Sequence, residues 1–517
     1  MNIDDKKLTA LRQKITESLR IQRDSSGTVP YIDASSILSD VCARQNHAIF
    51  ARRGCGKTLL LHESTRSLDR SIRTVYLNCE DFKQHSFPNV LVEILDALFD
   101  ELERHLAGWF GRKKRSRDLV KQIREQLSKL RISADTQEES VRHTTAAEIN
   151  ASTEASLAAS KLPISAKMGA TTGSKAKSEI ERSYNIHSDK LLELNMWLPS
   201  LKRQVREFFE VSGSVKAVFL QIDDLYHLKK VDQPFVIDYI HRLCKDVPLY
   251  FKIATLRHAS SLYIDRDGQP VGAQERHDYQ PINIDYTFAD FARTRDQNHR
   301  IFQEFGKLVG LKTEEIGALF KGKGFDRLVM AGGGVPRDTL SLFLEVLGSI
   351  RADKGDQIGK DDVRILSRSN FERRIEELKQ DSEGGEQDLL MRGIFALRAF
   401  CLEKKSNAFV ISEQTLQQRD DIRGLVNRLL DYRIIHNAGT AITHKSQAGT
   451  YQAFAIDIGC YAHLRKLYGR FNELDVSDRE AKEKLRSSPA FGESDFDAFL
   501  RDAPKDIEAA LLGDGDV

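Results

Sequence analysis

The sequence is poor in the features that mark membrane, secreted or metal-binding proteins. No apolar run approaches the roughly 20 residues needed to span a bilayer, and residues 1–7 contain no signal-peptide core. The six cysteines are scattered without metal-ligand spacing, so we expect reduced thiols. The net charge is only +2, so any basic binding surface must be local. Together these absences predict a cytoplasmic protein with no membrane partner.

The chain is long enough for several domains. At 517 residues it exceeds what one hydrophobic core usually supports, so two or three domains are expected. Its composition, with 40% hydrophobic and 30% charged residues, is that of an ordinary soluble protein.

A phosphate-binding loop is predicted at residues 51–58, Ala-Arg-Arg-Gly-Cys-Gly-Lys-Thr. This segment lies where a short apolar strand, 47–50, runs into a helical run, 59–63. Gly54 and Gly56 lack a Cβ, so the loop can turn its backbone N–H groups onto an anionic phosphate. The phosphate would also rest at the positive N-terminal end of the following helix. The layout therefore indicates a nucleotide site.

The residues after these glycines supply more specific chemistry. Lys57 would reach the β and γ phosphates of ATP, and the Thr58 hydroxyl would hold Mg²⁺. Ala51 stands where the pattern G-x-x-x-x-G-K-[ST] has its first Gly, a departure of one methyl group. The alternative interpretation is a glycine-containing turn with an incidental lysine. The residues predicted to contact ATP are Arg53, Gly54, Cys55, Gly56, Lys57, Thr58 and Leu59.

Two acids end an apolar strand, 217–222, where a P-loop ATPase needs carboxylates. Asp223 is predicted to enter the Mg²⁺ coordination shell and Asp224 to polarise the attacking water. Burying paired acids without a cation is costly, which favours this assignment over a helix N-cap or a turn. The usual second acid is Glu, and Asp224 is shorter by one methylene, so we expect slow hydrolysis.

Two further polar positions complete the predicted catalytic set. Thr255 follows the apolar run 249–254, on the strand after the acids, where it can touch the γ-phosphate or its water. A hydrogen-bonded turn residue is the alternative. The glycines of 332–337, Gly-Gly-Gly-Val-Pro-Arg, permit close approach, and Pro336 suits a first helical turn. Arg337 is then fixed where it can reach phosphate, although taken alone it would be a surface arginine.

Strand and helix patterns alternate through the first half, which predicts an α/β fold with a parallel, doubly wound sheet. The pattern then becomes helical, and a polar linker over 379–387 precedes a third unit. A stretch rich in Ala, Ser and Thr is interpreted as an insertion, either disordered or a projecting hairpin. The predicted domains are an N-terminal helical segment (1–30), a nucleotide-binding domain (31–290) containing the insertion (132–185), a helical lid (291–375), a winged helix (384–475) and an acidic, helical tail (476–517).

The unit after the linker has the element order of a winged helix-turn-helix. Its predicted elements are a helix over 389–403, a strand over 408–411, a helix over 422–430 and two strands flanking residues 437–450. If the unit binds duplex DNA, the helix over 422–430 is its recognition helix.

The cations that would contact DNA are few. They are Arg423 and Arg428 on the recognition helix and Lys445 in the wing. Three aspartates beside them would repel phosphate, namely Asp420, Asp421 and Asp431. Many winged helices bind only proteins, so the sequence leaves the ligand of this unit open.

These pieces resemble, in their order, the AAA+ ATPases of the origin-recognition (initiator) type, over about residues 30–470 apart from the insertion. Residues 52–58 are similar to that family's Walker A motif, 220–225 to its Walker B motif, Thr255 to sensor 1 and 334–337 to sensor 2. The resemblance implies a P-loop AAA+ core that binds ATP with Mg²⁺, a helical lid, and a C-terminal winged helix that often binds DNA. The sequence does not choose an arginine finger among Arg266, Arg276, Arg293 and Arg295.

Two functions remain open. The first is an ATP-dependent DNA-binding switch or assembly factor that works as a homo-oligomer or with a partner protein, on double-stranded DNA. The second is an ATPase of a signalling or anti-phage defence system that senses or recruits a protein partner through the winged helix. The resemblance permits the second, because bacterial relatives of this group are often found with mobile elements or anti-phage systems. No catalytic constellation for a protease, helicase or nuclease stands outside the nucleotide site.

Overall fold

The structure is a computed structural model of the protein. It describes residues 6–19, 31–32, 36–104, 114–131, 188–266, 268–352, 357–382, 384–462, 471–501, 503–504 and 506–512. The insertion predicted over 132–185 lies outside these residues. The chain forms two compact units, each built from separate stretches of sequence. We name Ser36–Phe50 with Leu60–Asn283 the sheet unit, and Met1–Ser35 and Ala51–Leu59 with Ile284–Val517 the lid-wing unit.

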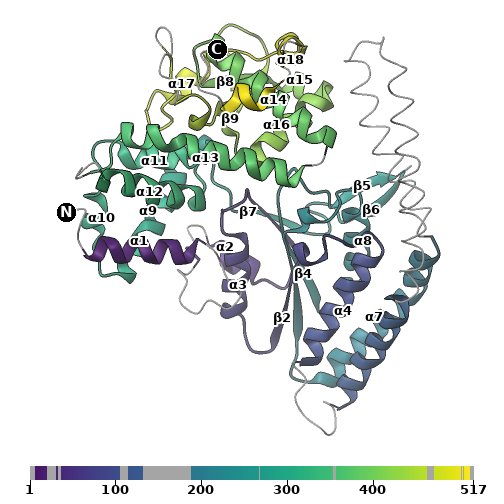
Figure 1. Ribbon diagram of the computed structural model, residues 1–517. Coiled ribbons are helices and arrows are strands. Elements are labelled where there is room, and N and C mark those ends of the chain that lie inside the picture. Colours follow the sequence, from purple (N-terminus) through teal and green to yellow (C-terminus); the bar gives the residue numbers. More distant parts are fainter. Residues whose placement is uncertain are drawn as a thin grey trace. The chain divides into compact units, whose positions relative to one another are not determined.

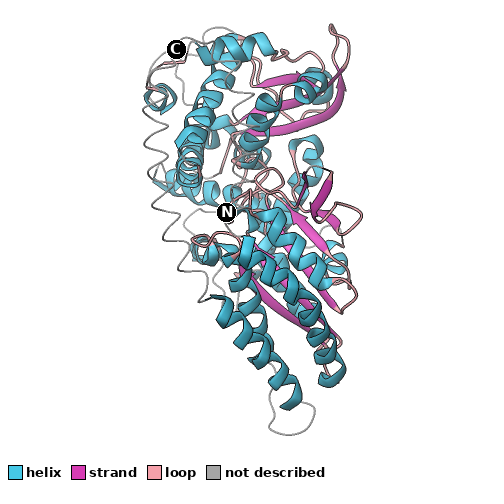
Figure 2. Cartoon of the chain, turned by 90° about the vertical axis from the view of Figure 1, so that its right-hand side faces the viewer, coloured by secondary structure: helices cyan, strands magenta, loops and turns pink. Residues whose placement is uncertain are grey.

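A five-stranded parallel sheet forms the centre of the sheet unit (Figure 1 and Figure 2). Its strands, in spatial order, are β2 (Ile72–Asn78), β3 (Ala217–Asp223), β4 (Leu249–Thr255), β1 (His47–Phe50) and β7 (Gln280–Asn283). Because every neighbouring pair is parallel, all five strands present their carboxyl ends at one edge. A separate antiparallel hairpin joins β5 (Tyr263–Arg266) to β6 (Gln269–Gly272). The predicted parallel sheet is confirmed.

Helices cover the two faces of this sheet, as buried parallel strands require. They are α2 (Ile37–Val41), α3 (Lys57–Ser67), α4 (Asn89–Arg104), a helix over 114–131, α7 (Ser188–Ser212) and α8 (Gln233–Cys244), with short 3-10 turns η1 (Cys79–Phe82) and η2 (Leu225–His227). Figure 1 shows α4, α7 and α8 on one side of the strands and α2 and α3 on the other. Alternate residues of β3, namely Val218, Leu220 and Ile222, join the core that contains the apolar faces of α4 and α8.

A lysine is buried on β4. Lys252 is 0% exposed, and its Nζ donates to the carbonyl oxygens of Ala43 at 2.6 Å and Gln45 at 2.8 Å. The same nitrogen lies 2.8 Å from His47 Nδ1. Burial lowers the pKa of Lys252 to about 7. Burial, and to a smaller extent the positive charge of Lys252, lowers the pKa of His47 to about 3. A charged Lys252 therefore opposes folding near neutral pH.

We expect the stability of the chain to rise with pH above about 7 because of Lys252. The unfolded chain keeps the lysine proton up to the ordinary value of 10.5, so between these values it binds more protons than the folded chain. The free energy of unfolding should rise by up to about 1.4 kcal/mol per pH unit. Lys252→Met should remove this slope in denaturant unfolding, whereas Lys216→Met, at an exposed position, should keep it. Equal slopes in Lys252→Met and the wild type would contradict the assignment.

The lid part of the lid-wing unit is helical. Its elements are α1 (Lys6–Ser18), the 3-10 turn η3 (Phe288–Asp290), α9 (Phe291–Leu308), α10 (Thr313–Gly317), α11 (Gly324–Ala331), α12 (Pro336–Ala352) and α13 (Lys360–Asp381). Leu8, Leu11 and Ile15 lie on one face of α1, and all three are buried in the same core as the later helices. Within the described ranges, every helix is too short or too polar to cross a membrane.

The wing part contains three strands and three helices. They are α14 (Gly384–Glu403), β8 (Ala408–Ser412), α15 (Glu413–Gln418), α16 (Asp420–Asp431), β9 (Ile435–Thr443) and β10 (Thr450–Ile456). The strands form an antiparallel sheet in the order β8-β10-β9. This contains the element order predicted from the sequence with one additional short helix, α15, and α16 covers the helix predicted over 422–430.

The predicted linker over 379–387 is mostly helical. α13 runs to Asp381 and α14 begins at Gly384, and Leu378 and Leu390 on either side are buried in one core. The lid and the wing therefore share a single hydrophobic interior, because apolar residues continue on both sides of the polar stretch.

The C-terminal segment packs onto the wing. Val410 on β8 donates a backbone hydrogen bond to Pro489 at 2.9 Å and accepts one from Phe491 at 2.8 Å. The rings of Phe491 and Phe496 are buried beside the wing core. Short elements complete the segment, namely η4 (Ile458–Cys460), α17 (Ala481–Leu485), α18 (Glu493–Arg501) and α19 (Ile507–Leu512).

Candidate functional site

The loop that follows β1 has the backbone geometry of a phosphate cradle. Gly54 and Gly56 have φ angles of +83° and +89°, a left-handed conformation that residues with a Cβ rarely adopt. α3 begins at Lys57, so the loop ends at a helix N-terminus. Ala51, at the position of the missing first Gly, lies outside the left-handed region and is 3% exposed. Its methyl group is therefore accommodated without backbone strain.

Lys57 is folded back onto this loop. Its side chain is 6% exposed, and its Nζ donates to Ala51 O at 3.0 Å and to Arg52 O at 3.3 Å. Both acceptors are neutral carbonyls, and phosphate oxygens are stronger acceptors for an ammonium group. The lysine can therefore exchange loop carbonyls for phosphate, with Thr58 next to it on the first turn of α3.

A buried ion pair between Arg52 and Asp285 fixes the beginning of the loop. Arg52 Nε and Nη2 donate to the two carboxylate oxygens at 2.7 and 2.8 Å, and Nη1 donates to Gly333 O at 3.0 Å. Burial alone would raise the pKa of Asp285, but the guanidinium group lowers it and keeps the carboxylate charged. Cys55 Sγ also donates to Asp285 Oδ1, at 3.6 Å, and burial raises the pKa of this thiol. Cys55 is thus held as a neutral packing group.

The glycine turn before α12 is packed against the protein itself. Gly333 and Gly334 have φ angles of +64° and +76°. A Cβ on Gly333 would lie 2.4 Å from His436 Cε1, and one on Gly334 would lie 2.6 Å from Thr294 Cγ2. The close approach predicted for these glycines is therefore an internal one.

Arg337 lies beside the phosphate loop. It follows Pro336 at the start of α12, and its N–H donates to Gly54 O at 3.3 Å. A Cβ on Gly54 would lie 2.8 Å from Arg337 Cβ and 2.9 Å from Val335 Cγ1. The backbone of Arg337 therefore lies next to the phosphate loop, and its side chain is exposed to solvent.

In the sheet unit, the two predicted acids end β3. Asp223 is 0% exposed, its Oδ2 accepts from Tyr76 OH at 2.8 Å, and its Oδ1 accepts from the Asp224 N–H at 3.0 Å. Asp224 has a φ of +53°, which costs a non-glycine residue on the order of 1 kcal/mol or more. Strained backbone angles of this kind cluster at active sites. The φ angle of Asp224 is therefore consistent with the functional role predicted for this residue.

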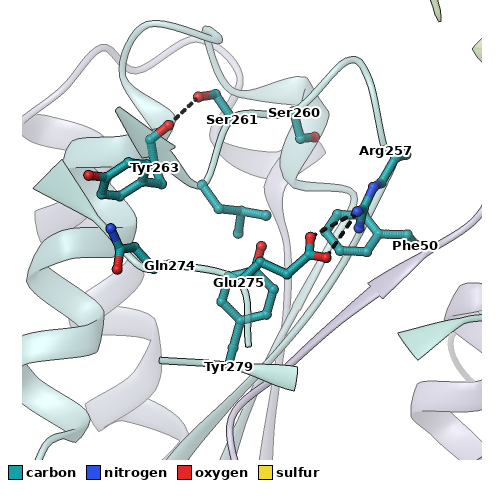
Figure 3. Close-up of a pocket in the computed structure, with 9 residues that line it drawn as sticks. Phe50, Arg257, Ser260, Ser261, Tyr263, Gln274, Glu275 and Tyr279 are labelled. Atoms are coloured by element: carbon teal, nitrogen blue, oxygen red, sulfur yellow. Dashed lines mark hydrogen bonds and ion pairs between the residues drawn. The ribbon is translucent and has the colours of Figure 1, made fainter. Parts of the chain in front are cut away.

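Thr255 ends β4 and is 0% exposed, with its Oγ1 2.5 Å from Ser260 Oγ. The residues after it line an open pocket of about 490 Å³ (Figure 3). Figure 3 shows Arg257 across the ring of Phe50, 4.4 Å from its centroid, and ion-paired with Glu275 at 2.8 Å. The remaining lining residues are Ser260, Ser261, Leu262, Tyr263, Gln274 and Tyr279.

The four arginines considered as a finger differ in their surroundings. Arg293 lies over an aromatic ring, 4.5 Å from its centroid, and Arg295 pairs with Asp326 at 2.5 Å. Arg266 ends β5, and Arg276 lies in an exposed turn with a φ of +66°.

The three cations predicted to contact DNA are all ion-paired. The pairs are Arg423 with Asp420 at 2.6 Å, Arg428 with Glu386 at 2.8 Å and Lys445 with Glu483 at 2.8 Å. Each pair is partly exposed to solvent, so water screens the attraction between its members and the pair is weak. DNA phosphates can therefore compete with these acids.

Each of the two units holds one oxygen group of a kind that Mg²⁺ takes from a protein. Magnesium in nucleotide sites takes one or two protein oxygens and fills its octahedron with phosphate and water. The Thr58 hydroxyl and the Asp223 carboxylate are ligands of that kind. Among the described residues, His, Cys, Asp and Glu form no group of three that would hold a metal by itself.

Comparison with known proteins gives only distant matches. The chain matches no protein-family model and no curated protein sequence. Among solved structures it is similar to the ORC2 protein of Aeropyrum pernix in ADPNP and ADP complexes, with 9% identity, a TM-score of 0.37, and 92% of this chain and 97% of that chain covered. It is similar to Drosophila ORC bound to DNA, with 12% identity, a TM-score of 0.34 and coverage of 90% and 93%. A Walker-type ATPase of Pyrococcus abyssi has 11% identity, a TM-score of 0.38 and coverage of 88% and 94%.

The order and direction of the strands fit the α/β core of a P-loop nucleotide-binding protein. This class is defined by the chain's own sheet, in which β1 carries the phosphate loop, β3 carries the acids and β4 lies between them. Origin-recognition proteins are among the structural neighbours over about nine-tenths of the chain. At identities near 10% these matches transfer no activity to this protein.

The ion pair of Arg52 and Asp285 was missed by sequence analysis. Its members are 233 residues apart, and each resembles an ordinary surface charge in the sequence. The only local signal is that Asp285 follows a strand, as Asp224 does, at the carboxyl edge of the sheet.

We expect Gly54→Ala to impair nucleotide binding while the matched variant Gly268→Ala does not. Both glycines are left-handed, at φ of +83° and +81°, but a Cβ at Gly54 meets Arg337 and Val335, whereas one at Gly268 meets nothing within 4 Å. Both variants should lose about 1 kcal/mol of stability from backbone strain. Only Gly54→Ala should weaken ATP binding, by about ten-fold or more, in titration calorimetry. Equal ATP affinities in the two variants would contradict the loop assignment.

Proposed function

We propose that this protein binds Mg²⁺-ATP at its phosphate loop and hydrolyses it slowly, as an AAA+ switch or assembly factor. The observation that supports this proposal most directly is the pair of left-handed glycines, Gly54 and Gly56, immediately before the N-terminus of α3. Backbone N–H groups in such a loop bind phosphate together with the helix dipole.

Each predicted residue has a distinct role in this proposal. Lys57 neutralises charge on the β and γ phosphates, and Thr58 and Asp223 hold the metal ion. The Mg²⁺ that Thr58 and Asp223 would hold would supply positive charge to offset the charge that develops on the phosphates. Asp224 polarises the attacking water, and Thr255 orients that water or a γ-phosphate oxygen.

Arg337 links the lid to nucleotide state. Its guanidinium would make a charge-assisted contact with the γ-phosphate, which ADP lacks. A ligand shifts a conformational equilibrium only through such a difference in interaction. The position of Arg337 at the start of α12, next to Gly54, supports this role.

Lys57→Ala and Asp224→Asn should separate ATP binding from hydrolysis. Lys57→Ala removes the cation on the phosphates, so ATP binding should fall below detection in calorimetry, with the circular dichroism spectrum unchanged. Asp224→Asn keeps the shape but loses the negative charge, so ATP affinity should persist while phosphate release slows by about a hundred-fold or more. Asp265→Asn, at an exposed acid in the β5-β6 hairpin, is the control. ATP affinity in Lys57→Ala equal to that of the wild type would refute the site.

The proposed ligand of the switch is duplex DNA, bound by the wing through phosphate contacts. α16 carries Arg423 and Arg428, and their partly exposed ion pairs are weak enough for phosphate to displace. Because these contacts go to phosphate and release counterions, binding should be sensitive to salt and nearly independent of sequence. The switch would work as a homo-oligomer or with a protein partner.

Replacing Arg423, Arg428 and Lys445 together by Gln should weaken binding to any duplex and flatten its dependence on salt. Each lost phosphate contact should lower the slope of log affinity against log salt by about 0.9. The control triple, Arg300→Gln, Lys307→Gln and Arg368→Gln, removes equal charge from ion pairs on the lid. The measurement is titration of labelled duplex with the full chain and ATP at two salt concentrations. An unchanged slope in the wing triple, or equal weakening in the lid triple, would place the DNA site elsewhere.

A second candidate function is an ATPase of a signalling or defence system that recruits a protein partner through the wing. The observation that favours it is the ion pairing of all three candidate cations, which places a carboxylate beside each of them. The same titration separates the two functions, because no binding to DNA at low salt would favour the protein partner.

A further inference from the structure

Arg433 occupies an unusual place between the wing and the phosphate loop. It lies in the turn after α16 and before β9, with a φ of +62°, a strained angle for a residue with a side chain. Its side chain is 2% exposed. From this turn its Nη1 donates to Arg53 O, a carbonyl of the phosphate loop, at 3.1 Å.

The guanidinium of Arg433 is held from two other sides. Its Nε lies 3.1 Å from Asp338 Oδ2, and its Nη2 pairs with Glu377. Asp338 is the residue after Arg337, so the same carboxylate fixes Arg433 and the start of α12. A buried guanidinium bound in this way has little freedom, because leaving its partners would strand buried charge.

The loop carbonyls are the groups that these contacts orient. Arg53 O accepts from Arg433, and Gly54 O accepts from the N–H of Arg337 at 3.3 Å. In a trans peptide the N–H points opposite to the C=O. Holding Arg53 O toward Arg433 therefore aims the N–H of Gly54 away from the wing, and the N–H of Gly54 is one of the donors of a phosphate cradle.

We propose that Arg433 is a positioning residue that sets the phosphate-binding geometry of the loop and couples it to the wing helix α16. The coupling rests on the proposed ATP site. A ligand that shifts α16 moves the strained turn that carries Arg433, and the hydrogen bond to Arg53 O then changes. By linkage, ATP and the ligand of α16 alter each other's affinity.

The test compares Arg433→Gln with Arg398→Gln. Arg398 is a matched buried arginine of the same unit, 2% exposed, which donates to Cys460 O at 2.9 Å and Ala510 O at 2.7 Å. Both variants should lower the melting temperature. Only Arg433→Gln should weaken ATP binding, by about ten-fold or more, the loss expected for one charge-assisted hydrogen bond. Equal ATP affinity in the two variants would overturn the proposal.

A second readout needs no nucleotide. Cys55 lies in the loop at 6% exposure, so its alkylation rate, resolved by peptide mass spectrometry, reports opening of the loop. Arg433→Gln should speed this labelling relative to Arg398→Gln, and an equal rate would overturn the proposal. If the wild type does not bind ATP, the proposed function fails, while the labelling rate still decides the role of Arg433.

Glu377→Gln is the variant that should perturb the stability of the fold least. Glu377 is 41% exposed, and its replacement loosens Arg433 without burying an unpaired charge. A smaller change in the same direction, in both ATP affinity and Cys55 labelling, is the expected result. No change in either, together with a normal melting temperature, would count against Arg433 as the positioning group.

Discussion

The lid-wing unit depends on the burial of Asp338 between two arginines. Its Oδ2 lies 2.9 Å from Arg374 Nη2 and 3.1 Å from Arg433 Nε. Burial alone would raise the pKa of Asp338, but the two guanidinium groups lower it and keep it ionised. Removing one member of such a set leaves a buried charge unpaired, at a cost of about 3–5 kcal/mol. The start of α12, the helix α13 and the turn before β9 are therefore held in one arrangement rather than in a range of them.

A second carboxylate carries this arrangement to the phosphate loop. Asp457 pairs with Arg374 and accepts from His436 Nε2 at 3.0 Å. Burial lowers the pKa of His436 to about 4, so the ring is neutral and its Nδ1 can accept from Arg52 Nη1 at 3.4 Å. The first arginine of the loop is thus bound to the same network that Asp338 organises. Burying these charged groups has a large desolvation cost, which their mutual contacts offset. Through these contacts the loop segment Ala51–Leu59 belongs to the compact unit that contains the wing.

Local patterns in the sequence were sufficient for the parallel sheet apart from β7, for the glycine loop and for the acids after β3, because each depends on residues within one strand and the turn that follows it. They were also sufficient for the order of elements in the wing apart from the short helix α15. The ion pairs of Arg52 and Arg433 were not predictable, since their partners are brought together only by packing of distant segments. The pairing of Arg423 with Asp420 shows a related limit, because neighbouring opposite charges could be either a binding surface or its neutralised form. The strands of the sheet could therefore be predicted from hydrophobic periodicity. The ion pairs of the site could be identified only from the folded structure.

In the proposed mechanism, nucleotide bound at the phosphate loop changes the conformational stability of the wing through buried contacts. Hydrogen exchange of the full chain, with and without Mg²⁺-ATP, tests it most directly, since exchange reports local opening segment by segment. The predicted result is joint protection of residues 51–59 and of the turn 431–436, with the hairpin β5-β6 unchanged as an internal reference. Protection confined to residues 51–59, with exchange at 431–436 equal in the two states, would contradict the account.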